Sequence, residues 1–210
     1  MTDRRGRGRP RMSETDTSAA ISAAALARFS VQGFEATSLR EIATDAGVDV
    51  ALIAYRFGGK AGLWKAIVSK SALDLQGVLA ATLEETAGRP PAERLRFSMQ
   101  AFLEYLIARP EVPRLLLRDI TLDTARSQWL LDELSMPLHR HFFDLAEAAV
   151  AFGTIAPAHL RFRIANFIYA AASTVARRER LARLVDDIGE DSAFETALED
   201  VLIRGVLNHG

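Results

Sequence analysis

The segment from Gly33 to Leu63 contains the local signals of two short helices joined by a tight turn. Ser38 and Glu41 have the spacing of a capping box, in which each side chain satisfies a backbone amide at the start of a helix. Gly47 stands where the first helix must stop, because glycine enters the left-handed conformation at little cost. Asp49 can then cap a second helix. This arrangement predicts a helix-turn-helix, whose second helix lies in the major groove of DNA.

The same segment, together with the helix before it, resembles a known family. The matching residues occur in order and without a gap: Ile21, Ala25, Phe29, Gly33, Phe34, Thr37, Ser38, Ile42, Ala43, Ala46, Gly47, Val48, Tyr55, Arg56, Phe57, Lys60, Leu63 and Trp64. The pattern resembles the TetR family of bacterial transcriptional regulators over about the first third of the chain. The alternative for the motif itself is a helical hairpin with no role in DNA binding.

The resemblance implies which side chains of the helix-turn-helix face DNA. Arg40 and residues 50–52 are the groove-facing positions, and the guanidinium of Arg40 can bond guanine with two parallel hydrogen bonds. Thr37, Arg56 and Lys60 are the positions that face the DNA backbone. The full set of expected DNA-binding residues is Arg7, Arg9, Thr37, Leu39, Arg40, Val50, Ala51, Leu52, Ala54, Tyr55, Arg56 and Lys60.

Two positions depart from the family pattern. Ala54 stands where the family usually has tyrosine, and Arg56 stands where it usually has histidine. The absence of that tyrosine hydroxyl removes a hydrogen bond to phosphate, which Arg56 can replace. Tyr55 is a second candidate for this role, although packing between helices is the interpretation we favour for it.

Residues 1–13 form an arm with five arginines and one aspartate. The run from Arg7 to Pro10 resembles the core of an AT-hook, because slim Arg-Gly-Arg units can enter narrow A·T-rich minor grooves. A solvated basic tail that adds only non-specific affinity is an equal alternative. Residues 1–65 contain ten Lys or Arg and seven Asp or Glu, whereas the remainder contains sixteen and twenty. The basic excess therefore lies with the helix-turn-helix.

The hydrophobic pattern predicts an all-α fold of about nine helices. We expect residues 14–74 to form the helix-turn-helix domain and residues 75–210 to form a domain for effector binding and dimerisation. Pro110 and Pro113 open one helix of the second domain, and Pro137 is a candidate bend. The other expected helices outside the helix-turn-helix cover residues 14–32, 60–86, 91–108, 125–152, 159–185 and 192–207.

The apolar residues of the central helices suggest a pocket, which in TetR relatives accepts a small effector. The expected lining residues are Phe102, Tyr105, Trp129 and Phe142, with plain core packing as the alternative for each. The last two long helices also need a cover, and pairing with the same helices of a second subunit supplies one. The expected homodimer interface contains Phe167, Ala171, Leu198 and Val201, with burial inside one subunit as the alternative.

Several function classes have no support in the sequence. Cysteine is absent, which excludes a disulfide framework and thiolate metal ligands. His139 and His141 lie two residues apart on an expected helix and point to different sides, so they do not form a chelating pair. No catalytic constellation stands out, and we expect neither an enzyme nor a cofactor. No apolar run of eighteen residues or secretory signal is visible, which predicts a cytoplasmic protein without a membrane span.

These features predict a ligand-responsive regulator that binds a double-stranded operator sequence as a homodimer. By resemblance it is a repressor, which a small-molecule effector releases from a palindromic operator. A different class of function is a non-specific architectural DNA binder that uses the Arg-rich arm. Two further classes are a helical binding module that has lost DNA binding, and an enzyme.

Overall fold

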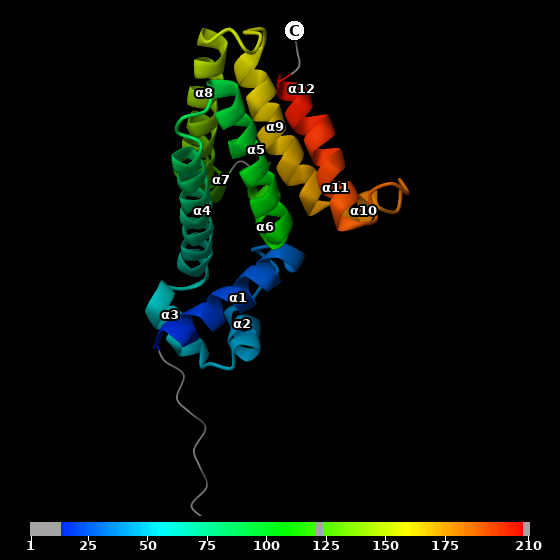
Figure 1. The fold of residues 1–210 in the computed structure, drawn as a ribbon. Coiled ribbons are helices and arrows are strands. Elements are labelled where there is room, and N and C mark those ends of the chain that lie inside the picture. The colour runs from blue at the N-terminus through cyan, green and yellow to red at the C-terminus, as the bar shows by residue number, and fades with distance from the viewer. Residues whose placement is uncertain (1–13, 121–123, 208–210) are drawn as a thin grey trace, which may run out of the picture. The chain divides into compact units, whose positions relative to one another are not determined.

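The computed structural model describes residues 14–120 and 124–207 (Figure 1). The regular structure in these ranges is helical throughout, and it forms ten continuous helices, which confirms the all-α fold class. The chain divides into two compact units, Met1–Ala66 and Ile67–Gly210. The division falls inside one long helix, α4 (Lys60–Glu85). The arm with Arg7 and Arg9 lies outside the described residues.

The first unit consists of α1 (Glu14–Gln32), α2 (Leu39–Ala46), α3 (Val50–Phe57) and the first turns of α4. Its core contains Ile21, Ala25, Phe29, Ile42, Ile53, Leu63 and Trp64, all fully buried. The capping box is confirmed, because the Glu41 amide donates to Ser38 Oγ and the Ser38 amide donates to Glu41 Oε2. Gly47 ends α2 with a φ of +64°, and Asp49 caps α3. The local signals thus produce the predicted helix-turn-helix.

The second unit contains the rest of α4 and a set of packed helices. These are α5 (Pro91–Ala108), α6 (Glu111–Ile120), α7 (Ala125–Leu130), α8 (Met136–Ala151), α9 (Leu160–Ala176), α10 (Arg178–Leu181), α11 (Asp191–Leu198) and α12 (Arg204–Leu207). Two π-helical turns, η1 (Leu131–Ser135) and η2 (Glu199–Ile203), join α7 to α8 and α11 to α12 without a break. In Figure 1, α5, α8 and α9 lie together and the α11–α12 rod runs beside α9, in agreement with their contacts.

The centre of the second unit is a cluster of three phenylalanine rings. Phe102 of α5, Phe142 of α8 and Phe167 of α9 lie with ring centroids 5.7–5.9 Å apart. Phe167, Ala171 and Leu198 are at most 3% exposed within one chain. They are therefore buried inside one subunit, which is the alternative to a place in the dimer interface. Their own core covers them and leaves no surface for a partner, which corrects the expected interface. Val201, at 70% exposed, is the member of that set that remains on the surface.

Two helix predictions differ from the structure. The helix expected over residues 159–185 is wrong in length, because α9 ends at Ala176 and only the short α10 follows. Fully buried apolar residues at helical spacing end at Val175, and beyond it up to residue 187 only Leu181 packs against the core, with most other side chains exposed. The distortion expected at Pro137 lies one turn earlier, in η1, because proline has no amide to continue the helical bonding.

Helix α4 also bears on the expectation of no membrane span. Within the described ranges, α4 is the helix whose length and composition alone are sufficient to cross a bilayer. The expectation concerns an uninterrupted run of eighteen apolar residues, and Lys65, Lys70 and Asp74 interrupt the apolar residues of α4. Leu75 and Leu79 of α4 belong to the hydrophobic core of the second unit, as expected for a helix that packs inside a folded protein. Composition does not distinguish such a helix from a spanning one.

Candidate DNA-binding surface and effector pocket

Helix α3 presents one exposed face and buries the opposite one. Ile53 is fully buried and Leu52 is half-buried. The exposed residues are Val50, Ala51, Ala54 and Tyr55. Tyr55 is 88% exposed, so the favoured interpretation of packing between helices is wrong. Its phenol is instead free to reach a group outside the chain, and the sequence contains no local signal that distinguishes these two roles.

Arg40 lies in the first turn of α2 and is exposed, whereas Leu39 beside it is half-buried. Among the residues that the structure describes, none forms a hydrogen bond or ion pair with the Arg40 guanidinium, and Thr44 bonds only the Arg40 carbonyl oxygen. Its five N–H donors are therefore available to an external acceptor, such as the edge of a guanine base.

Thr37 and Lys60 serve the interior of the first unit. Thr37 is 1% exposed, and its hydroxyl donates to the Gly33 carbonyl at 2.8 Å, so the side chain cannot reach a phosphate. Lys60 Nζ donates to the carbonyl oxygens of Phe34, Glu35 and Thr37 at 2.9, 3.3 and 3.0 Å. These three bonds use all three ammonium protons. Lys60 therefore holds the turn between α1 and α2, which corrects its expected role as a cation facing the DNA backbone.

Arg56 connects α3 to α1. Its Nη1 donates to the hydroxyl of Ser18, which lies in the second turn of α1. The residue is half-buried. A phosphate contact from Arg56 consequently competes with a bond that orients the recognition helix.

Arg28 of α1 joins two carboxylates of α2. Its Nη1 lies 2.7 Å from Glu41 Oε1, and its Nε and Nη2 lie 2.5 and 3.0 Å from the two oxygens of Asp45. Hydrogen bonds from Ser38 and the charge of Arg28 lower the pKa of Glu41. The hydrogen bond from Arg28 is the main cause that lowers the pKa of Asp45. Both carboxylates are thereby held in their charged forms across the α1–α2 contact.

We expect the first unit to lose stability in acid through these two carboxylates. Because their pKa values are lower in the folded state, their contribution is present above the unfolded pKa and is lost as the pH falls through the folded pKa. Thermal unfolding followed by Trp64 fluorescence in a Trp129→Phe background measures the effect. The further substitution Arg28→Met should flatten the dependence, and identical pH profiles with and without Arg28 would contradict this account.

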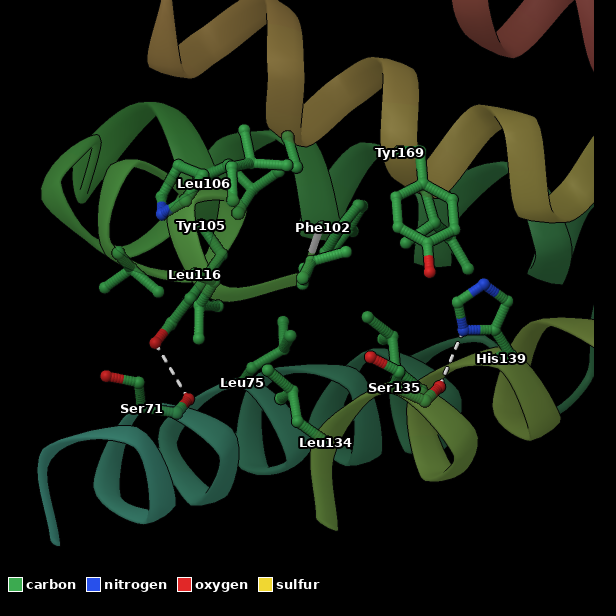
Figure 2. A pocket seen from close by; sticks show the side chains of 17 residues that line it. Ser71, Leu75, Phe102, Tyr105, Leu106, Leu116, Leu134, Ser135, His139 and Tyr169 are labelled. Carbon is green, nitrogen blue, oxygen red and sulfur yellow. Dashed lines mark hydrogen bonds between the residues drawn. The ribbon is translucent and has the colours of Figure 1, made fainter. Parts of the chain in front are cut away.

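The second unit contains an apolar pocket with about 60 Å³ of free volume (Figure 2). Side chains from α4, α5, α6, η1, α8 and α9 line it, and most of them are aliphatic: Leu75, Leu106, Leu116, Leu117, Ile120, Leu134, Leu138 and Ile168. Phe102 and Tyr105 are among the lining residues. Trp129 is not part of the lining, and Phe142 lies instead in the phenylalanine cluster, fully covered by Phe102 and Phe167.

Polar groups lie at two places in the lining (Figure 2). Tyr105 OH donates to the backbone carbonyl of Ser71 at 2.9 Å, and burial raises the pKa of this phenol, which keeps it neutral. His139 Nδ1 lies 2.6 Å from the carbonyl oxygen of Ser135, in the π-helical turn η1. Tyr169 lies near His139, with ring centroids 5.7 Å apart. The pocket thus combines an aliphatic body with a few hydrogen-bonding groups, as small-molecule sites usually do.

Comparison with known proteins gives three kinds of match. Residues 21–67 match the family of bacterial regulatory proteins, tetR family. The probable HTH-type transcriptional regulator YttP of Bacillus subtilis (strain 168) is 31% identical over 117 residues, which are 56% of this chain and 56% of that protein. The chain thus aligns with about half the length of this curated relative. The relative is described as a probable regulator of transcription.

Solved structures share the fold over most of the chain. A putative fatty acid metabolism regulator from Clostridium perfringens has a TM-score of 0.72 at 17% identity, over 90% of this chain and 97% of that chain. A TetR-like transcriptional regulator from Rhodococcus sp. RHA1 has a TM-score of 0.70 at 20% identity, over 93% and 98%. At these identities the likeness establishes the fold alone.

Proposed function

We propose that this chain is a member of the TetR family of bacterial regulatory proteins and a sequence-specific DNA-binding regulator of transcription. One observation carries the proposal. The helix-turn-helix is capped as its sequence predicts, and it leaves the Arg40 guanidinium and the outer face of α3 exposed and unused by the described protein. An exposed recognition helix with a free arginine beside it is the arrangement that reads base edges in the major groove.

The exposed residues divide into two roles on this proposal. Val50 and Ala51 offer apolar surface to thymine methyl groups, and Arg40 hydrogen-bonds a guanine. Tyr55 donates its phenol proton to a phosphate, one position after the site where relatives usually carry tyrosine. Lys60 and Thr37 contribute indirectly, because they fix the turn that presents α2.

We further propose that the protein acts as a homodimer in the cytoplasm. A dimer presents two recognition helices to successive major grooves and so prefers a palindromic operator. Exposed apolar side chains on α9 and η2, Phe162 and Val201, are 73% and 70% exposed and support a second copy as the cover of this face. Val201 belongs to the expected interface, and Phe162 takes the place of its buried members.

The pocket is the proposed effector site. Ser71 and Leu75 of its lining belong to α4, the same continuous helix whose first residue is Lys60 of the DNA-binding unit. An effector changes operator affinity only by its different affinity for the two states of the protein. Repression relieved by the effector is the outcome that the family resemblance favours.

Selection of bound sequences from a random DNA pool, with full-length protein and with a form lacking residues 1–13, tests the proposal. A palindromic motif selected by both forms supports a dimeric reader of sequence. A pool without a motif, or an A·T-rich pool that depends on residues 1–13, would replace the proposal with the architectural DNA binder.

The substitution Arg40→Ala tests base reading directly. We expect a loss of about 1–3 kcal/mol in operator binding and relaxed specificity at one base pair per half-site, because one bidentate contact is removed. Fluorescence anisotropy with operator variants and random DNA measures both effects. Arg140→Ala, an exposed arginine of α8 in the second unit, is the matched control. An equal loss on operator and random DNA would assign Arg40 to a phosphate instead.

A further inference from the structure

The polar groups at the two ends of the pocket differ in whether their hydrogen-bond donors are already used. At the Tyr105 end, the phenol donates to the Ser71 carbonyl, and the Ser71 hydroxyl donates to the Ile67 carbonyl at 3.1 Å. Both donors at this end are therefore occupied. Figure 2 shows Ser135, His139 and Tyr169 together at the other end of the pocket.

The bond between His139 and Ser135 fixes the imidazole tautomer. A carbonyl oxygen only accepts, so Nδ1 carries a proton, and Nε2 accepts a hydrogen bond in the tautomer in which Nδ1 alone is protonated. Within the described part of the chain, the hydroxyls of Ser135 and Tyr169 have no hydrogen-bond partner, and Tyr169 is 40% exposed at this end of the pocket. This end consequently offers one ring acceptor and two hydroxyls, which can donate or accept.

The charge of the lining narrows the ligand class. None of the described residues that line the pocket is Asp, Glu, Lys or Arg. In the aliphatic interior of the pocket, a carboxylate or ammonium without an opposite charge is far more costly than a hydroxyl whose hydrogen bonds are satisfied. The pocket therefore disfavours permanently charged ligands and suits an apolar body with one neutral head.

We propose that the effector is a neutral amphiphile with an aliphatic or aromatic body and a single hydroxyl head, an alcohol or a phenol. Its hydroxyl donates to His139 Nε2 and accepts from Tyr169 OH, while the body contacts the leucine side chains. This inference rests on the proposed function, because it assigns a ligand class to the effector site.

The size of the pocket adds a consequence. An engineered cavity of about 150 Å³ holds one benzene molecule, whereas this pocket has about 60 Å³ free. An alcohol with a body of several carbons must therefore displace lining side chains. Leu134 and Ser135 lie in the π-helical turn, where helical bonding is already irregular beside Pro137. A ligand that widens the pocket there distinguishes two states, as an effector must.

Isothermal titration calorimetry of the full-length protein without DNA tests the ligand class. Octan-1-ol, octanoate, octylamine and 1-methoxyheptane share nearly the same length and differ in their heads. We expect octan-1-ol to bind at least tenfold more tightly than each of the others, because octanoate and octylamine are charged and the ether has no proton for His139. Equal or tighter binding of octanoate or octylamine, or no binding of octan-1-ol, would overturn the proposal.

A substitution that removes a single hydroxyl oxygen tests the assigned site. Tyr169→Phe should weaken octan-1-ol binding by about fivefold, the size of one hydrogen bond, with an unchanged thermal midpoint. Thr196→Val, which removes an exposed hydroxyl of α11 outside the pocket lining, is the matched control and should leave ligand binding unchanged. An unchanged affinity in Tyr169→Phe would overturn the site. Operator selection with ligand-free protein is independent of these titrations, so DNA binding can stand if the ligand class fails.

Discussion

Gly62→Ala is expected to destroy operator binding, although Gly62 contacts no base or phosphate on the present proposal. Gly62 lies in the first turns of α4, and a Cβ at this position would lie 1.7 Å from the carbonyl oxygen of Phe57, the last residue of α3. Backbone atoms cannot move aside as a flexible side chain can. The substitution therefore separates α3 from α4 or unfolds the unit, at a cost of about 3 kcal/mol or more.

The same helix provides the control for this prediction. A Cβ added at Gly77 meets no atom within 4 Å, and the residue is exposed in the middle of α4. Gly77→Ala should therefore raise stability by about 0.5–1 kcal/mol. Operator binding by anisotropy and thermal unfolding followed through Trp64 fluorescence measure both variants. Wild-type operator affinity in Gly62→Ala would contradict the close approach of the two helices.

The helix-turn-helix shows what the sequence alone can predict. The capping box of Ser38, the left-handed Gly47 and the Asp49 cap are contacts over two to four residues, and each is present as expected. The bounds of α1, α3 and α5 agree with the predicted ranges for the same reason. Where neighbours in the chain decide the structure, pattern and propensity are sufficient.

Several of the misplaced residues depend on partners that are far away in the sequence. Phe142 and Phe167 have the apolar spacing of a pocket or an interface, but that spacing does not specify which surface covers them. The exposure of Tyr55 likewise depends on where α1 and α4 pack, because the sequence around it does not separate a core aromatic from a free one. A hydrophobic stripe predicts a buried face, and only the fold identifies what buries it.

Lys60 shows this dependence on distant partners most clearly, because its expected role and its observed role predict opposite experimental results. Lys60→Met keeps the aliphatic stem but removes three donors to the carbonyls of Phe34, Glu35 and Thr37, and it removes the ammonium 4.5 Å from the Phe34 ring. We expect the first unit to lose about 2 kcal/mol of unfolding free energy, because hydrogen bonds from a charged donor exceed neutral ones. Lys70→Met, which breaks only an exposed pair with Asp74, should cost about 0.3–0.5 kcal/mol.

The salt dependence of operator binding separates the two roles of Lys60. A phosphate contact contributes about one unit to the slope of log affinity against log salt concentration, whereas a residue that holds a turn contributes none. We expect Lys60→Met to lower the thermal midpoint and to leave that slope unchanged at temperatures where the unit stays folded. A reduced slope with an unchanged midpoint would return Lys60 to the DNA backbone. The turn between α1 and α2 would then be held by the Thr37 hydroxyl and the Arg28 ion pairs, without the lysine.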